Sequence, residues 1–491
     1  MSAPGGSAPA HPTPPKSLTG QQLRWNRCPD PAPAQGPGPA PGKAWECATL
    51  KVPLDWDQPR DRTIGLALVR AKALDRDKRI GSLIFNFGGP GASGANILPA
   101  VEDKFERLRH SYDLVGFDPR GAGRSHGITC LSGAELDRFY ARDATPDTPE
   151  ERAANAAQTR RYAAACQKES AAVLPHVDTE SAARDIDLMR EVLGDRKTSY
   201  FGISYGTLLG AMYVHLFPEK AGRIVLDGAV DPTLGPEQAD LMQTRGFQLA
   251  LDHWMKKCVM SKKCPTGQSV AEGNRRLASW LRGLDARALP TNRGRKLTAD
   301  LATVGIAAAL YSEQLWDVLT RGLDQAMRHG RGDILLALSD LHNERDSQGR
   351  YSSRQAAQTA VNCADTSDHV SEERITELVP RFREASPVFG QYLAWTMGAC
   401  NGWPVHGKSV RLDVRAPGAG PVLVIGATGD PATPFAGARR LAQALGKDVG
   451  VEIGMRGEGH GAYVSGNACL TRLVDDYLLW NIVPSRGTYC E

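Results

Sequence analysis

Short apolar runs alternate with helix-like stretches over much of the chain. Two strand-like runs, residues 47–54 and 63–71, flank a polar turn and predict an antiparallel hairpin at a sheet edge. The other strand-like runs are almost continuously apolar, and each precedes a turn and a helical stretch. They span residues 82–87, 112–117, 198–203, 223–230, 422–425 and 449–455. Such strands predict an α/β fold with a mostly parallel sheet that helices cover on both faces.

The pattern changes to helical apolar spacing after residue 232. We therefore predict a helical lid at residues 233–417, inserted between two parts of an α/β core at residues 45–232 and 418–491. An independent helical domain, unrelated to any site, is the alternative. Residues 1–44 are dominated by Pro, Ala and Gly, so we expect an extended, mobile tether that Cys28 pins in part to the body.

The composition is that of a soluble globular protein. Of 491 residues, 41% are hydrophobic and 23% are charged, and the formal net charge is only +4. This weak charge, without a basic run interleaved with aromatic residues, argues against nucleic-acid binding. No apolar stretch approaches the roughly 18 to 20 residues of a membrane helix, so we expect no membrane span. The first residues lack the features of a signal peptide, which fits a cytosolic start or a mature chain with an added methionine.

The cysteines favour an extracellular protein. Their number, ten, is even, and no C-x-x-C pair occurs, so zinc-ribbon and redox motifs lack support. We expect five disulfides and a secreted protein, with reduced core cysteines as the alternative. Pairing of neighbours along the chain is the simplest guess, although sequence alone does not determine connectivity.

The stretch with the clearest chemistry is GISYG at residues 202–206. It lies between an apolar strand and a helix, which is the pattern of a nucleophile elbow with Ser204 at its tip. Glycines two residues either side of the serine leave room where side chains would collide with the neighbouring strand and helix. Such a pattern also arises by chance in a chain with 51 glycines. It indicates a nucleophile only if the chain also supplies a base, an acid and oxyanion donors.

An acyl-transfer serine needs a base, an acid that orients the base, and donors for the oxyanion. Asp430 ends a buried strand in the loop GDP, and His460 follows in the glycine-flanked loop GEGHG. The order Ser, Asp, His is the one expected for this class of fold. Asp430 as a mere turn acid is the alternative, but three features in the correct order predict a Ser204–Asp430–His460 triad.

The oxyanion hole should follow an early strand, where the sequence has NFGGPGASG at residues 86–94. We predict the backbone N–H groups of Gly89 and Tyr205 as donors, since the second belongs to the residue after the nucleophile. The same loop satisfies G-x-G-x-x-G, and Asp118 follows, so a dinucleotide site is formally allowed. Pro90 removes a backbone donor, and that alternative leaves the triad unexplained.

Several motifs together resemble one known family. The loop GGPG, the run FDPRGAGRS at residues 117–125, the elbow GISYGT and the acid loop GDPATP resemble the secreted tripeptidyl aminopeptidases of actinobacteria. These are α/β-hydrolases related to prolyl aminopeptidases, and the resemblance runs from about residue 45 to the end, cysteine pattern included. Asn86 stands where prolyl aminopeptidases have His. The resemblance implies a serine exopeptidase, without metal or cofactor, that removes short peptides, most simply tripeptides, from free N-termini.

An enzyme that measures from a free N-terminus must bind an ammonium group. The segment VNCAD at residues 361–365 resembles the lid motif of this family, and we predict Asp365 as the amine anchor, held by a disulfide of the adjacent Cys363. A helix-capping or surface acid is the alternative for Asp365. Trp403 is predicted to be a lid aromatic that faces the substrate, with core packing as its alternative.

The resulting prediction is a secreted monomer that acts on the N-termini of peptides or small proteins through an acyl-enzyme on Ser204. The first alternative is an esterase, or another hydrolase of an acylated small molecule, because the same triad cleaves esters and fold does not determine substrate. The second is a catalytically idle secreted binding protein that keeps the fold.

Overall fold

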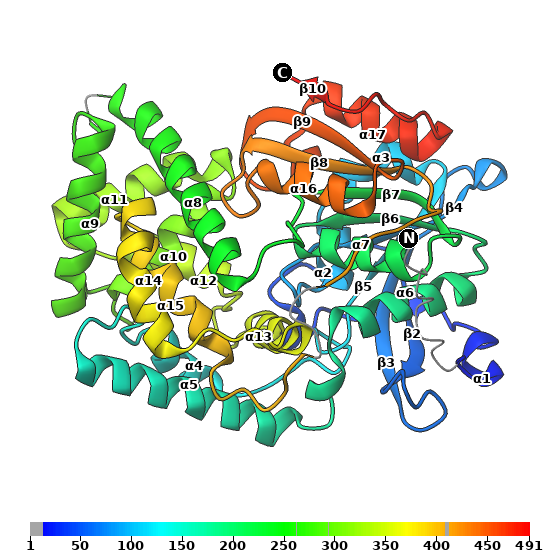
Figure 1. Ribbon diagram of the computed structural model, residues 1–491, viewed down its shortest axis with the longest axis horizontal. Coiled ribbons are helices and arrows are strands. Elements are labelled where there is room, and N and C mark those ends of the chain that lie inside the picture. The colour runs from blue at the N-terminus through cyan, green and yellow to red at the C-terminus, as the bar shows by residue number, and fades with distance from the viewer. Residues whose placement is uncertain (1–12, 262, 293, 408–411) are drawn as a thin grey trace, which may run out of the picture.

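The computed structural model describes residues 13–261, 263–292, 294–407 and 412–491, so the first twelve residues of the predicted tether lie outside the described part. Its centre is one ten-stranded sheet with the order β1-β2-β3-β5-β4-β6-β7-β8-β9-β10 (Figure 1). The strands are β1 (Asn26–Arg27), β2 (Trp45–Pro53), β3 (Thr63–Ala71), β4 (Gly81–Asn86), β5 (Tyr112–Phe117), β6 (Thr198–Ile203), β7 (Ala221–Asp227), β8 (Val422–Gly429), β9 (Gly450–Glu458) and β10 (Thr488–Cys490).

Strand direction follows the apolar pattern. From β5 and β4 through β6 to β10 every neighbouring pair is parallel, and every residue of β4, β5 and β6 is buried. The hairpin of β2 and β3 pairs antiparallel from Trp45 opposite Ala71 to Pro53 opposite Thr63, and β3 joins β5 antiparallel. Continuously apolar strands thus lie inside the parallel part, as buried strands must. Both the mostly parallel sheet and the edge hairpin are confirmed.

Helices cover the two faces of the sheet and create two apolar clusters. One cluster contains Ile186, Leu209 and Leu441, from helices α6 (Thr179–Leu193), α7 (Tyr205–Leu216) and α16 (Ala436–Leu445). The other contains Leu98, Leu108 and Leu478, from α2 (Gly94–Ala100), α3 (Glu106–Arg109) and α17 (Ala468–Trp480). This three-layer packing is the arrangement that buries both faces of a parallel sheet.

Further helices gather beside the sheet, at the left of Figure 1. Eight of the described helices lie between β7 and β8: α8 (Pro236–Val259), α9 (Val270–Ala286), α10 (Ala299–Leu310), α11 (Trp316–His329), α12 (Asp333–His342), α13 (Arg354–Asp365), α14 (Glu372–Ala385) and α15 (Gly390–Thr396). Two helices from earlier in the chain, α4 (Gly133–Tyr140) and α5 (Pro149–Ser170), join them. The sequence analysis assigned those two to the core, because their apolar positions say nothing about their distant partners.

The proline-rich start differs from the expected free tether. Residues 13–44 contain α1 (Lys16–Thr19), β1 and a 3₁₀ turn, and they pack on the body. Gln35 is only 6% exposed, its amide donates to Asp118, and the backbone oxygen of Ala34 accepts from the N–H of Ser353. A segment that cannot build its own core is thus fixed by hydrogen bonds to loops of the main body. The mobile-tether prediction is wrong for these residues.

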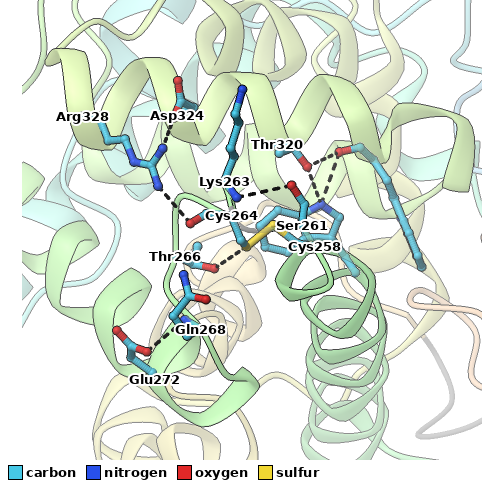
Figure 2. The surroundings of a disulfide bond; sticks show 12 residues. Cys258, Ser261, Lys263, Cys264, Thr266, Gln268, Glu272, Thr320, Asp324 and Arg328 are labelled. Atoms are coloured by element: carbon cyan, nitrogen blue, oxygen red, sulfur yellow. Dashed lines mark hydrogen bonds and ion pairs between the residues drawn. A yellow bond between two sulfur atoms is a disulfide. The ribbon is translucent and has the colours of Figure 1, made fainter.

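All ten cysteines form disulfides between neighbours along the chain, as expected. The pairs are Cys28–Cys47, Cys130–Cys166, Cys258–Cys264, Cys363–Cys400 and Cys469–Cys490. Figure 2 shows the pair that ties the end of α8 to the loop before α9, where Arg328 of α11 donates to the backbone oxygen of Cys264. Five disulfides fit an oxidising compartment. Within the described part, no helix has the length and apolar character needed to cross a bilayer.

Candidate active site

The predicted nucleophile lies on a strained turn between β6 and α7. Ser204 has φ 60° and ψ −125°, a conformation that side-chain-bearing residues rarely adopt, and the helix begins at the next residue. Only glycine fits at the two flanking positions, because a side chain at either one would collide with nearby backbone. A Cβ at Gly202 would lie 2.2 Å from the backbone oxygen of Gly206, and one at Gly206 would lie 2.6 Å from that of Asn86. The turn therefore presents Ser204 at the amino end of α7, where partial positive charge favours an anion.

The predicted acid and base lie together. Nδ1 of His460 is 3.0 and 2.9 Å from the two carboxylate oxygens of Asp430. Asp430 is 1% exposed, and its Oδ1 also accepts the backbone N–H groups of Ala432 and Thr433. The Thr433 hydroxyl donates to Oδ2 of the same carboxylate and lies 3.2 Å from Nδ1 of His460. This network fixes both the carboxylate and the imidazole plane.

The end of β7 connects the nucleophile to this pair. The backbone N–H of Ser204 donates to the backbone oxygen of Asp227 at 3.0 Å. The Asp227 carboxylate accepts the N–H groups of Ala462 and Tyr463, just after His460. A Cβ at Gly228 would lie 3.2 Å from Cε1 of His460 and 3.5 Å from Oδ2 of Asp430. The sequence analysis missed Asp227, although an acid that ends an apolar strand is a signal that could have identified it.

The glycine loop after β4 lies against the elbow. A Cβ at Gly88 would lie 2.7 Å from Cβ of Ser204 and 3.1 Å from the backbone nitrogen of Tyr205. In the part of the chain that the structure describes, the N–H groups of Gly89 and Tyr205 donate to no acceptor. Two free donors beside a nucleophile are what an oxyanion hole requires.

The same loop gives no support to a dinucleotide site. Asp118, the acid that would bind a ribose, is 0% exposed. Its carboxylate accepts hydrogen bonds from the Ser93 hydroxyl, from the Gln35 amide and from the backbone of Ala95 and Arg124. These bonds hold the loop in shape and leave the carboxylate no access to a ligand.

Helix α10 forms the wall beside the imidazole. The N–H of His460 donates to the backbone oxygen of Tyr311, and the two rings meet edge to face with centres 5.4 Å apart. The His460 side chain is 10% exposed. Burial lowers the pKa of His460, but the Asp430 carboxylate outweighs burial, so this pKa is raised above its ordinary value. The sequence analysis also missed Tyr311, because no local motif indicates that it contacts a histidine so far along the chain.

The two predicted substrate-binding residues have structural roles. Asp365 ends α13, and its carboxylate accepts both the backbone N–H and the hydroxyl of Thr179, the first residue of α6. The Thr179 hydroxyl is also 2.7 Å from that of Tyr205. Trp403 is 1% exposed, belongs to one of the two apolar clusters, and has its ring centre 6.5 Å from that of Tyr162 in α5. Helix capping and core packing, the alternatives for these residues, fit the contacts better than substrate binding.

The fold and the site define an α/β-hydrolase. Eight strands follow the order of that fold, a serine sits on the tight turn after a central strand, and an acid and a histidine follow on later loops.

Comparisons with known proteins define the family. The TAP-like protein model matches residues 386–490. The chain is 36% identical over 485 residues to "Serine protease Hip1" of Mycobacterium tuberculosis, covering 96% of this chain and 91% of that protein. It is 35% identical over 489 residues to "Carboxylesterase B" of the same species, covering 97% and 92%. It is 31% identical over 464 residues to the tripeptidyl aminopeptidase of Streptomyces lividans, covering 91% and 84%. The chain belongs to the family of these relatives and is a serine hydrolase.

Proposed function

We propose that this serine hydrolase is a secreted aminopeptidase that releases tripeptides from the free N-termini of peptides and small proteins. Ser204 is the nucleophile, His460 the general base and acid, and Asp430 the residue that orients the imidazole. The N–H groups of Gly89 and Tyr205 form the oxyanion hole, and residues 233–417 act as a lid over the site. The observation that carries the proposal is the contact of Asp430 with Nδ1 of His460, together with Ser204 on a strained elbow.

The geometry supports a two-step reaction. Ser204 Oγ attacks the scissile carbonyl while Nε2 of His460 takes its proton, and the oxyanion receives the two free N–H groups. Asp430 stabilises the imidazolium, which then gives the proton to the leaving amine, so that the peptide bond breaks and an acyl-enzyme remains. A water molecule, deprotonated by His460, attacks the ester and releases the tripeptide and Ser204.

The choice of a peptide substrate is supported by the relatives. The serine protease and the tripeptidyl aminopeptidase both align over more than nine-tenths of this chain. The five disulfides support secretion, because such bonds persist in oxidising compartments.

Release of a fluorogenic amine from tripeptide amides tests the proposal. Two substrates of identical sequence, one with a free and one with an acetylated N-terminus, are compared, with Ser204→Ala as control. Fast cleavage of the free form alone, abolished in the variant, is the expected result. Equal cleavage of both forms would refute recognition of the N-terminus and indicate an endopeptidase.

An esterase is the second candidate, and one observation favours it. A relative that aligns over 97% of this chain is named carboxylesterase B. If neither peptide amide is cleaved while small esters turn over rapidly in a Ser204-dependent way, this function replaces the first.

A further inference from the structure

A cavity of about 290 Å³ lies among the helices beside the sheet, between α4–α5 on one side and α10, α12, α13, α14 and α15 on the other. Tyr140, Arg142, Asp300, Gln355 and Trp395 belong to its lining. Its volume is near the lower end of the range for small-ligand sites. The catalytic residues do not line it, and the reaction described above makes no use of it.

Two buried polar groups in this lining lack partners. Asp300 is 5% exposed, and its Oδ2 accepts the backbone N–H of Ala144, but its Oδ1 has no hydrogen-bond partner among the described residues. Trp395 is 8% exposed, and its indole N–H is equally without a partner there. Buried polar atoms without partners are costly and uncommon, so each needs a reason. A carboxylate oxygen in a cavity is matched by a ligand that brings a donor, and best by a cation.

The lining has two arginines, Arg142 and Arg160, and among the described residues neither forms an ion pair with Asp300. Arg142 donates to the backbone oxygen of Phe139 at 2.7 Å and to the side chain of Asn155, and its guanidinium lies over the Phe139 ring. Burial, with the nearby Asp143 carboxylate adding to it, raises the pKa of Asp300 to about 7, although the N–H of Ala144 and the Arg142 charge oppose the shift.

Three neighbouring rings connect the cavity lining to His460. The ring centres of His460 and Tyr311 are 5.4 Å apart, and those of Tyr311 and His342 are 6.0 Å apart. The His342 ring, which lines the cavity, is therefore no more than the sum of these two distances from the His460 ring. Helix α13 gives a second connection. Its Gln355 lines the cavity, while Ala357 packs so close to Gly91 of the oxyanion loop that a Cβ there would lie 2.7 Å away.

Helix α10 links the loop of His460 to the unpartnered carboxylate. Tyr311 at its end contacts His460, and Asp300 lies in its first turn. At about 1.5 Å per residue, these two positions are about 16 Å apart along the axis. An extended tripeptide covers about 10–11 Å, which is the same order of length as this separation.

We propose that this cavity holds the residues on the N-terminal side of the scissile bond and that Asp300 binds their free α-ammonium group. The proposal rests on the aminopeptidase function and names the residue that measures substrate length. The carboxylate pairs with the ammonium group, and the rings of Tyr140 and Trp395 offer it aromatic contacts.

Asp300→Asn tests the proposal, because an amide oxygen can still accept the N–H of Ala144 while the amide nitrogen cannot bind a cation. The kcat/KM for a free tripeptide amide is expected to fall at least about 30-fold, whereas turnover of a small acyl ester stays unchanged. The preference for tripeptide over dipeptide amides is also expected to be smaller in Asp300→Asn than in the wild type. Glu372→Gln, which changes another acid of the lining, and Asp240→Asn, which changes an acid of α8, are the matched controls. Thermal unfolding and labelling of Ser204 by a phosphonate show that each variant is folded.

The possible outcomes distinguish a failure of the Asp300 anchor from a failure of the aminopeptidase function. If the wild type selects free N-termini but Asp300→Asn keeps full kcat/KM on them, Asp300 is not the anchor and only this inference fails. A loss in Glu372→Gln or Asp240→Asn, with none in Asp300→Asn, would overturn it in the same way by identifying another anchor. If the wild type does not select free N-termini, the aminopeptidase function fails and this inference fails with it.

Discussion

The backbone N–H of Ser204 donates to the backbone oxygen of Asp227 at 3.0 Å, where β6 and β7 end side by side. The Asp227 carboxylate accepts the N–H groups of Ala462 and Tyr463, so one residue fixes the backbone of Ser204 and the loop of His460 together. Burial raises the pKa of Asp227 to about 6, although the two N–H groups oppose the shift. The negative charge of Asp227 raises the pKa of His460.

The first prediction concerns pH. The proposed reaction needs neutral His460, so kcat/KM for a small ester should rise with pH through the raised pKa of His460, above the ordinary value of about 6.5. The Asp430 and Asp227 carboxylates both raise this pKa. Asp227→Asn removes one of these charges and should move the midpoint to lower pH. The variant should also lose about 1–3 kcal/mol of stability, because its amide nitrogen faces a backbone N–H. An unchanged midpoint in a folded variant would contradict the electrostatic role.

The second prediction concerns Asp430. Asp430→Asn keeps an oxygen for the N–H groups of Ala432 and Thr433 but turns a donor toward Nδ1 of His460, which favours the wrong tautomer. Turnover should fall by about four orders of magnitude with little change in melting temperature. Asp448→Asn, at an exposed position after α16, is the control. Activity near that of the wild type would remove Asp430 from the triad.

The strands of the sheet could be predicted from the sequence because each one corresponds to a short apolar run. The runs at residues 112–117 and 198–203 coincide with β5 and β6, since a strand buried on both faces must be apolar throughout. The run at residues 63–71 coincides with β3 of the hairpin. The prediction of Ser204, Asp430 and His460 rests on a related local signal, because tight turns need glycines beside the functional side chain.

Contacts between segments that are distant in the chain could not be predicted from the sequence. Nothing local indicates that α4 and α5 line a cavity with α10, or that Asp300 keeps an unpartnered oxygen there. Asp365 was chosen for its motif, but its carboxylate caps α6 through Thr179, a residue that precedes it by 186 positions. Gln35 lies in a stretch whose composition indicates disorder, yet hydrogen bonds to the body bury it.

The third prediction concerns a link between α8 and the histidine loop. Nδ1 of His253 lies 2.8 Å from Oε1 of Glu458, two residues before His460, and Oε2 of Glu458 has no partner in the described structure. Burial raises the pKa of Glu458, and His253 opposes that shift. His253→Ala should therefore cost about 1–3 kcal/mol of stability and lower turnover, because the loop loses its contact with α8.

A double-mutant cycle checks this link. Glu458→Gln in the His253→Ala background removes the charge that the first substitution strands, so part of the lost stability should return. Thermal unfolding of the wild type, both single variants and the double variant gives the coupling. Additive effects of the two substitutions would show that the contact contributes nothing of its own.

The last prediction sets stability against activity at Asp300. Its pKa is about 7 in the folded protein and about 3.9 in an unfolded chain. The folded state thus holds a proton that the unfolded state releases, and the stability this proton provides is lost as pH rises from about 4 to about 7. Asn resembles the protonated acid, so Asp300→Asn should unfold at a higher temperature than the wild type at pH 8, by a margin that shrinks toward pH 4.5. A gain on the order of a few kcal/mol at pH 8 is expected. A margin independent of pH would mean that the carboxylate is not charged in the cavity. A stability gain together with lost cleavage of free N-termini would mean that the buried charge is retained for binding, since the protein is more stable without that charge.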